Sequence, residues 1–87
     1  EDKYQGTPTL VVETLSPSSR SKDRVKKLDL YMESGIEEFW IVDPKTKSVM
    51  VYSFKDSELD KDTFYISGQT AESIHFPGLL VPLDKLF

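Results

Sequence analysis

The sequence predicts an α+β fold in which a helix crosses over a mixed β-sheet. Short runs of β-branched and aromatic residues alternate with turn residues, which is typical of strands. A longer segment between the first two runs has its apolar residues at helical spacing. A strand–helix–strand order favours a right-handed parallel crossover, and the close spacing of the next two strands favours an antiparallel hairpin. We expect one domain, or a piece of one, over residues 1–87, with residues 1–7 flexible.

Residues 9–15 form the first predicted strand, because β-branched residues dominate this run. It is apolar on both faces, which predicts a central position in the sheet. Pro17 cannot continue a sheet ladder, so the strand ends before it.

A helix is predicted over residues 22–34. Ser19 or Ser21 can supply the N-cap oxygen, and Gly35 suits the left-handed C-cap. The inner stripe of this helix consists of Val25, Leu28 and Met32.

The second half of the chain predicts mainly strands. Residues 38–43 are apolar on both faces, residues 43–47 have turn chemistry, and residues 48–54 form the hairpin partner. The remaining expectations are a polar loop at 56–62, short edge strands at 64–66 and 72–75, and a short closing helix at 82–87. The aromatic residues Phe39, Trp40, Tyr52 and Phe54 are expected in the core or on a sheet face, and not as platforms for base stacking.

Composition excludes several kinds of site. The chain has no cysteine and one histidine, His75, so disulfides, thiolate nucleophiles and multi-histidine metal sites are excluded within one chain. His75 is interpreted as a structural residue. No apolar run approaches the roughly 18 residues of a membrane span, and no secretory leader is seen. These features predict a cytoplasmic protein without a membrane partner. The net charge of -4 argues against indiscriminate nucleic-acid binding.

One extended pattern resembles a known family. The stretch Leu10-Val11-Val12-Glu13-Thr14-Leu15-Ser16-Pro17-Ser18 is similar to the signature L-V-V-E-V-L-S-P-S of the Uma-two family. The resemblance covers the chain from Pro8 onward; it continues through Asp23, Lys27, Leu28, Tyr31, Gly35, residues 38–44 and residues 77–87. It implies the restriction-endonuclease (PD-(D/E)XK) fold, with this chain as a C-terminal portion truncated at its N-terminal side.

The resemblance also implies a function, the magnesium- or manganese-dependent hydrolysis of phosphodiester bonds, with DNA as partner. The acidic ligands would be an Asp from an upstream strand and the Glu that matches Glu13. Lys27 would supply the catalytic cation, because Leu15 stands where the usual Glu-x-Lys motif has lysine. Thr9 also departs from the Asp that the family often carries. These departures favour the alternative of a non-catalytic or degenerate member that acts as a protein-interaction or nucleic-acid-binding module.

The chemistry of Glu13 leaves two interpretations open. Side chains two apart on a strand share a face, so Glu13 points the same way as Val11 and Leu15. A buried carboxylate without a partner is costly, so Glu13 needs a metal, a cation or a hydrogen-bond cluster. It is therefore either a metal ligand or half of a structural ion pair.

The helix offers partners for this carboxylate. Asp23, Lys27 and Tyr31 are four residues apart and line one helix face. In the functional interpretation, Lys27 faces Glu13 while Asp23 and Tyr31 orient the lysine. The alternatives are a solvated face with a weak Asp23–Lys27 pair, or Lys26 as the active cation.

Two further expectations concern partners. Arg20, Lys22 and Arg24 either contact DNA phosphates near the start of the helix or form a solvated surface. An unpaired edge strand exposes backbone groups that can pair with another chain, so we expect a homo-oligomer formed through an exposed sheet edge.

Overall fold

The computed structural model describes residues 10–15 and 20–87, with the backbone alone for residues 20–25. Its main sheet contains β1 (Leu10–Thr14), β2 (Glu38–Asp43), β3 (Ser48–Lys55) and β4 (Glu58–Ile66) in the order β1-β2-β3-β4. Helix α1 (Arg20–Glu33) lies between β1 and β2 in the chain. Strands β5 (Thr70–Glu72) and β6 (Leu80–Pro82) pair separately, and a 3-10 turn, η1 (Leu83–Lys85), follows.

The pairing confirms a mixed sheet with one helix. β1 runs parallel to β2, whereas β2–β3 and β3–β4 are antiparallel. None of the described helices has the length and apolar character that a membrane crossing needs.

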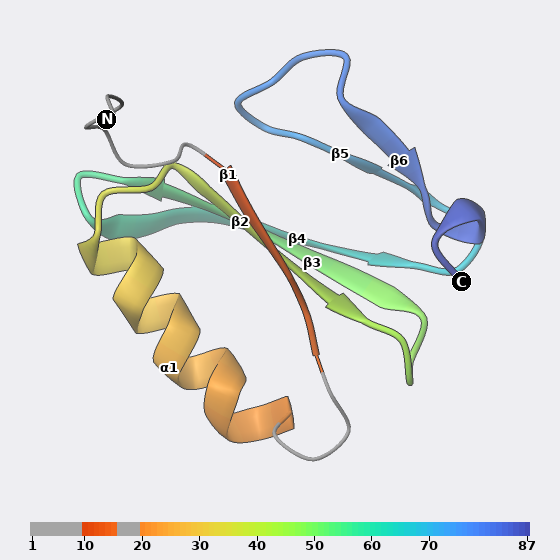
Figure 1. Cartoon of the computed structure of the whole chain (residues 1–87). Helices are drawn as coiled ribbons and strands as arrows, with labels where there is room; N and C mark the ends of the chain where they lie inside the picture. Colours follow the sequence, from red (N-terminus) through yellow and green to blue (C-terminus); the bar gives the residue numbers. More distant parts are fainter. Residues whose placement is uncertain (1–9, 16–19) are drawn as a thin grey trace, which may run out of the picture.

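The main sheet has a hydrophobic core on each face. Figure 1 shows α1 on one side of the sheet and the β5–β6 pair on the other. The α1 side buries Phe39, Ile41, Tyr52 and Phe54 together with Leu15 and Ile36. The opposite side buries Trp40, Val42, Val49 and Val51 against Ala71 and Leu83. Because β2 and β3 contribute to both cores, the expected core positions of the four aromatic residues are confirmed.

Helix α1 follows its predicted pattern closely. Leu28, Tyr31 and Met32 pack against the core on this face of the sheet. Gly35 has φ +87°, the left-handed conformation expected just beyond the helix. Ser21 lies inside the helix and is therefore not its cap, while Ser19, the side chain of Val25 and residues 1–7 lie outside the described part of the chain.

The predicted loop at residues 56–62 is wrong. Only Asp56 and Ser57 form a turn, and β4 begins at Glu58. Nearly all of β4 is exposed, so its polar residues lie on an edge strand whose backbone pairs with β3. The strand expected at 64–66 is the end of β4.

The last elements also differ from expectation. The strand expected at 72–75 is wrong except for Glu72, which ends β5, and β6 is not among the predicted strands. The closing helix at 82–87 is reduced to the single turn η1.

The predicted central position of the first strand is wrong for the described residues. β1 is the terminal strand of the main sheet, and Val12 is 55% exposed. Its apolar character has another cause, because Val11 and Leu15 pack on the α1 side while Leu10 packs on the opposite side.

Candidate functional site

The candidate site starts from Glu13, near the end of β1. Parallel pairing places Glu13 opposite Ile41 of β2. Its neighbours on the same face, Val11 and Leu15, pack in the core under α1, so the strand directs Glu13 toward the helix. The side chain of Glu13 remains 27% exposed, which leaves the carboxylate within reach of solvent.

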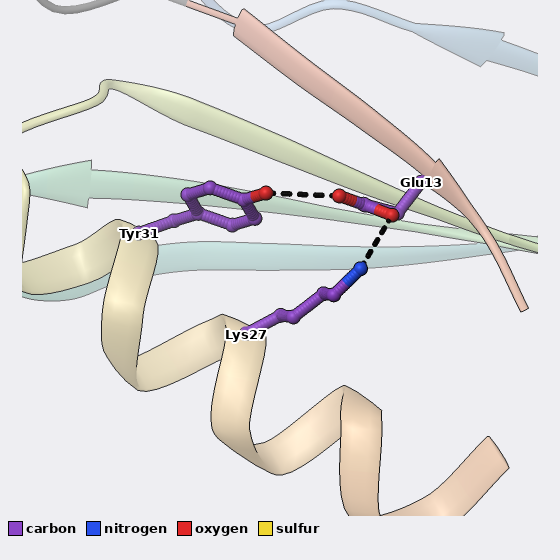
Figure 2. A network of polar contacts seen from close by, with 3 residues as sticks. All are labelled: Glu13, Lys27 and Tyr31. Atoms are coloured by element: carbon purple, nitrogen blue, oxygen red, sulfur yellow. Dashed lines mark hydrogen bonds and ion pairs between the residues drawn. The ribbon is translucent and has the colours of Figure 1, made fainter. Parts of the chain in front are cut away.

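Two residues one turn apart on α1 meet this carboxylate (Figure 2). Lys27 Nζ donates to Glu13 Oε1 at 2.8 Å, and the Tyr31 hydroxyl donates to Glu13 Oε2 at 2.8 Å. Residues four apart on a helix lie on one face, which explains why both reach the same strand residue. The structure therefore brings Glu13, Lys27 and Tyr31 together, with Tyr31 on the carboxylate and not on the lysine.

The environment raises the pKa of Tyr31 above its usual value. The main cause is its hydrogen bond to the Glu13 carboxylate, followed by burial and by the negative charge of Glu13, while the charge of Lys27 acts in the opposite direction. Tyr31 is thus a neutral hydrogen-bond donor at neutral pH.

Aromatic packing holds the Tyr31 ring. The ring meets Phe39 of β2 edge-on, with centroids 4.9 Å apart and an interplanar angle of 60°. Phe39 in turn stacks with Tyr52 of β3 at 6.3 Å. These contacts connect the hydroxyl at the site to the core of the sheet.

The chain matches a family model over residues 1–83, and this family is Uma2, described as a putative restriction endonuclease. The chain belongs to the Uma2 family. The fold is similar to the crystal structure of a putative nuclease of the DUF820 group from Anabaena variabilis ATCC 29413, with a TM-score of 0.69 and 23% identity. The match covers 97% of this chain and 46% of that chain, so the Uma2 chain spans about half of the solved protein's length. No curated protein matches the sequence.

The Uma2 residues at the site do not by themselves make a magnesium site. Magnesium takes six oxygen ligands, usually with one or two carboxylates among them. Both oxygens of Glu13 accept hydrogen bonds from protein donors. Among the side chains of residues 10–15 and 26–87, no group of three acidic or histidine residues is arranged to hold a metal. Glu13 is thus one candidate ligand and not a complete set.

The other predicted site residues of the Uma2 chain come from the first two turns of α1. Asp23, Arg20, Lys22 and Arg24 belong to the helix, but their side chains are outside the described part. Lys26 is described, and its side chain is exposed. Among the described side chains, Lys27 places its cation at Glu13.

A second carboxylate, Glu38, was missed by the sequence analysis. It is fully buried on β2, where Oε1 accepts hydrogen bonds from the Ser73 hydroxyl and from the backbone N–H groups of Ile74 and His75. Its Oε2 accepts one from the indole N–H of Trp40. A signal was present, because alternation puts Glu38 on the same strand face as Trp40 and Val42, both apolar. Through these hydrogen bonds Glu38 connects residues 73–75, the corner after β5, to the main sheet.

His75 belongs to the same corner of the Uma2 chain. Its Nε2 lies 2.9 Å from the hydroxyl of Ser53, which is fully buried on β3. This partner supports the structural interpretation of His75, since a buried hydroxyl needs a hydrogen bond.

Proposed function

We propose that this Uma2 chain contributes the carboxylate and the cation of a nuclease active site that hydrolyses phosphodiester bonds in DNA. The observation that carries the proposal is the convergence of Lys27 and Tyr31 on Glu13. Family membership and the nuclease-like fold support it. The placement also suits access by a polymer, because the Lys27 side chain is 39% exposed and Glu13 is 27% exposed.

Each residue has a distinct chemical role in this proposal. Hydrolysis requires a cation near the developing phosphate charge and a base near the attacking water. Lys27 supplies the positive charge, and its flexible stem lets the ammonium reach a phosphate oxygen. Glu13 is the acceptor for the proton of the water. Tyr31, as a neutral donor, holds the carboxylate.

Magnesium or manganese is the proposed cofactor. Glu13 would supply one oxygen ligand, and the family resemblance implies a second acidic ligand from a strand upstream of β1. When bound, such an ion stabilises negative charge on the phosphate and activates water. A manganese titration followed by NMR tests this directly, since paramagnetic broadening centred on the amide of Glu13 is expected. Broadening confined to residues 56–62 would reject Glu13 as a ligand.

Cleavage of a labelled DNA duplex in magnesium or manganese tests the proposed activity. Glu13→Gln keeps the size of the side chain and removes the base, so we expect a loss of at least about a hundredfold in rate. Lys27→Met keeps the aliphatic stem and should lower the rate comparably, while circular dichroism shows both variants folded. Cleavage retained by Glu13→Gln would contradict the assignment of Glu13 as the base. Inactivation by Lys26→Met, with Lys27→Met active, would transfer the cationic role to Lys26.

A non-catalytic binding module is the second candidate function. It is favoured by Leu15, which is buried where the usual motif has lysine, and by the incomplete set of acidic ligands among the described residues. Fluorescence anisotropy with the same duplex separates the two functions. Binding without cleavage in either metal supports the module, and cleavage supports the nuclease.

The proposed phosphate contacts of Arg20, Lys22 and Arg24 predict a salt dependence. Each phosphate contact contributes a slope of about -0.9 to a plot of log affinity against log salt concentration. Replacing all three residues with Gln should therefore flatten the slope by about 2.7 if each meets one phosphate. An unchanged slope would show that these residues form a solvated surface.

A further inference from the structure

The two donors that the described side chains place at Glu13 differ in how firmly they are held. Tyr31 has two side-chain torsions, and its ring is packed edge-on against Phe39, which is only 1% exposed. Lys27 has a flexible four-carbon stem, and its side chain is 39% exposed. The same distance of 2.8 Å therefore joins Glu13 to a donor anchored by ring packing and to a donor on a flexible, partly exposed stem.

We infer that Tyr31 is the residue that positions the Glu13 carboxylate, while Lys27 is an exchangeable counter-ion of that carboxylate. Tyr31 fixes Oε2 through the row of rings that ends in the core. Lys27 can leave Oε1 for another anion without moving the carboxylate. This division of roles deepens the proposed function and rests on it for its purpose, because a nuclease needs a stationary base and a cation that can turn to a phosphate.

Solvent separates the two interactions physically. An ion pair between partly exposed groups is screened by salt, because mobile ions compete for both charges. A hydrogen bond from a neutral hydroxyl held by ring packing depends much less on ionic strength. Raising the salt concentration should thus release Lys27 before it affects Tyr31.

The test follows Glu13 by NMR in the isotopically labelled full chain, without nucleic acid. We expect Tyr31→Phe, which keeps the ring and its contact with Phe39, to lower the order parameter of the Glu13 side-chain methylene toward that of the exposed Glu37. Lys27→Met should leave this order parameter close to the wild-type value. A tyrosine that served packing alone would leave Glu13 equally ordered after Tyr31→Phe, and that result overturns the positioning role.

Matched controls and a salt series complete the experiment. Tyr65→Phe makes the same chemical change on the opposite face of the sheet, and Lys26→Met makes the same change one residue from Lys27; both should leave Glu13 unaltered. From low to molar potassium chloride, the Lys27 Nζ resonance should move to that of a free lysine while the Tyr31 hydroxyl resonance stays. A Lys27 resonance that does not respond overturns its exchangeability. Since no cleavage is measured, an inactive protein would refute the proposed function and leave this inference standing.

Discussion

At the level of single residues, the candidate site depends on one carboxylate that, among the described side chains, meets two unlike hydrogen-bond donors. Lys27 carries a charge, whereas Tyr31 is a neutral hydroxyl whose pKa is raised further above its usual value by the hydrogen bond to Glu13, by burial and by the charge of Glu13. The ion pair is partly exposed, so its contribution to stability is about 1 kcal/mol or less. The main effect of the arrangement is therefore to position Glu13, and its contribution to stability is small.

The raised pKa of Tyr31 predicts a loss of stability at alkaline pH. The folded chain holds the Tyr31 proton more tightly than the unfolded chain does, so the contribution is complete below about pH 10 and is lost as the pH rises through the folded pKa. Urea unfolding across this range should show that wild type exceeds Tyr31→Phe in free energy of unfolding at neutral pH. The difference should shrink at alkaline pH. A constant difference at every pH would contradict this linkage, and Tyr65→Phe is the control.

At the level of elements, the corner after β5 is held by a buried carboxylate. Glu38 accepts hydrogen bonds from Trp40, Ser73, Ile74 and His75, so four donors depend on it. Removing an acceptor leaves each buried donor unsatisfied, which costs more than the hydrogen bond itself contributes. The corner in turn covers the face of the sheet opposite α1.

Glu38→Ala should therefore destabilise the chain by about 3 kcal/mol or more. Thermal unfolding followed by circular dichroism measures the effect. The neighbouring Glu37→Ala is the matched control, since Glu37 is exposed and its replacement should change stability by about 0.5 kcal/mol or less. Equal effects of the two substitutions would show that the buried network does not stabilise the corner.

The turn between β3 and β4 is a second feature at this scale. Asp56 and Ser57 have φ values of 54° and 62°, a left-handed conformation that favours glycine. Ser57→Gly should raise the free energy of unfolding by up to about 1 kcal/mol, because hairpin turns with two positive φ values prefer glycine. Urea denaturation checks this gain. An unchanged midpoint would mean that the greater freedom of glycine in the unfolded chain offsets the relieved strain.

The sequence predicts an element well when its pattern of apolar residues is distinct. β2 is predicted well because the run is apolar on both faces, as expected for a buried strand, and all six of its residues are buried. Residues 58–62 of β4 are predicted as a loop because Asp and Lys residues dominate them, and this exposed segment is a strand through its backbone pairing with β3. Lys27 and Tyr31 were placed by helical spacing, whereas the burial of Glu38 depends on residues 73–75, which are distant in sequence.

For the whole molecule, the main sheet carries a core on each face and ends at β1 among the described residues. Next to this strand lies an apolar hollow of about 290 Å³, lined by Leu10, Val12, Trp40, Val42, Leu79, Val81 and Leu86. Terminal strands offer backbone groups for pairing with another chain. These two features of β1 are the reason why we still predict the homo-oligomer expected from the sequence.

Light scattering on the purified chain tests that prediction. We expect the mass of a dimer or a larger species at high concentration. Val12→Lys introduces a charge at a side chain that is 55% exposed on β1, so it should shift the mass toward the monomer. Phe64→Lys, on β4 at the other end of the sheet, is the control, because Phe64 is similarly exposed at 52%. A monomer mass for the wild-type chain would refute assembly through β1.

The tight turn between β3 and β4 also bears on the order in which the chain folds. Only two residues separate these strands, whereas β1 meets β2 across α1 and its connections. Closing the longer loop costs more entropy, so we expect the hairpin to form early and β1 to dock late. Glu13 would then join Lys27 and Tyr31 among the last events of folding. Mild denaturant should accordingly remove the site while circular dichroism still reports most of the sheet.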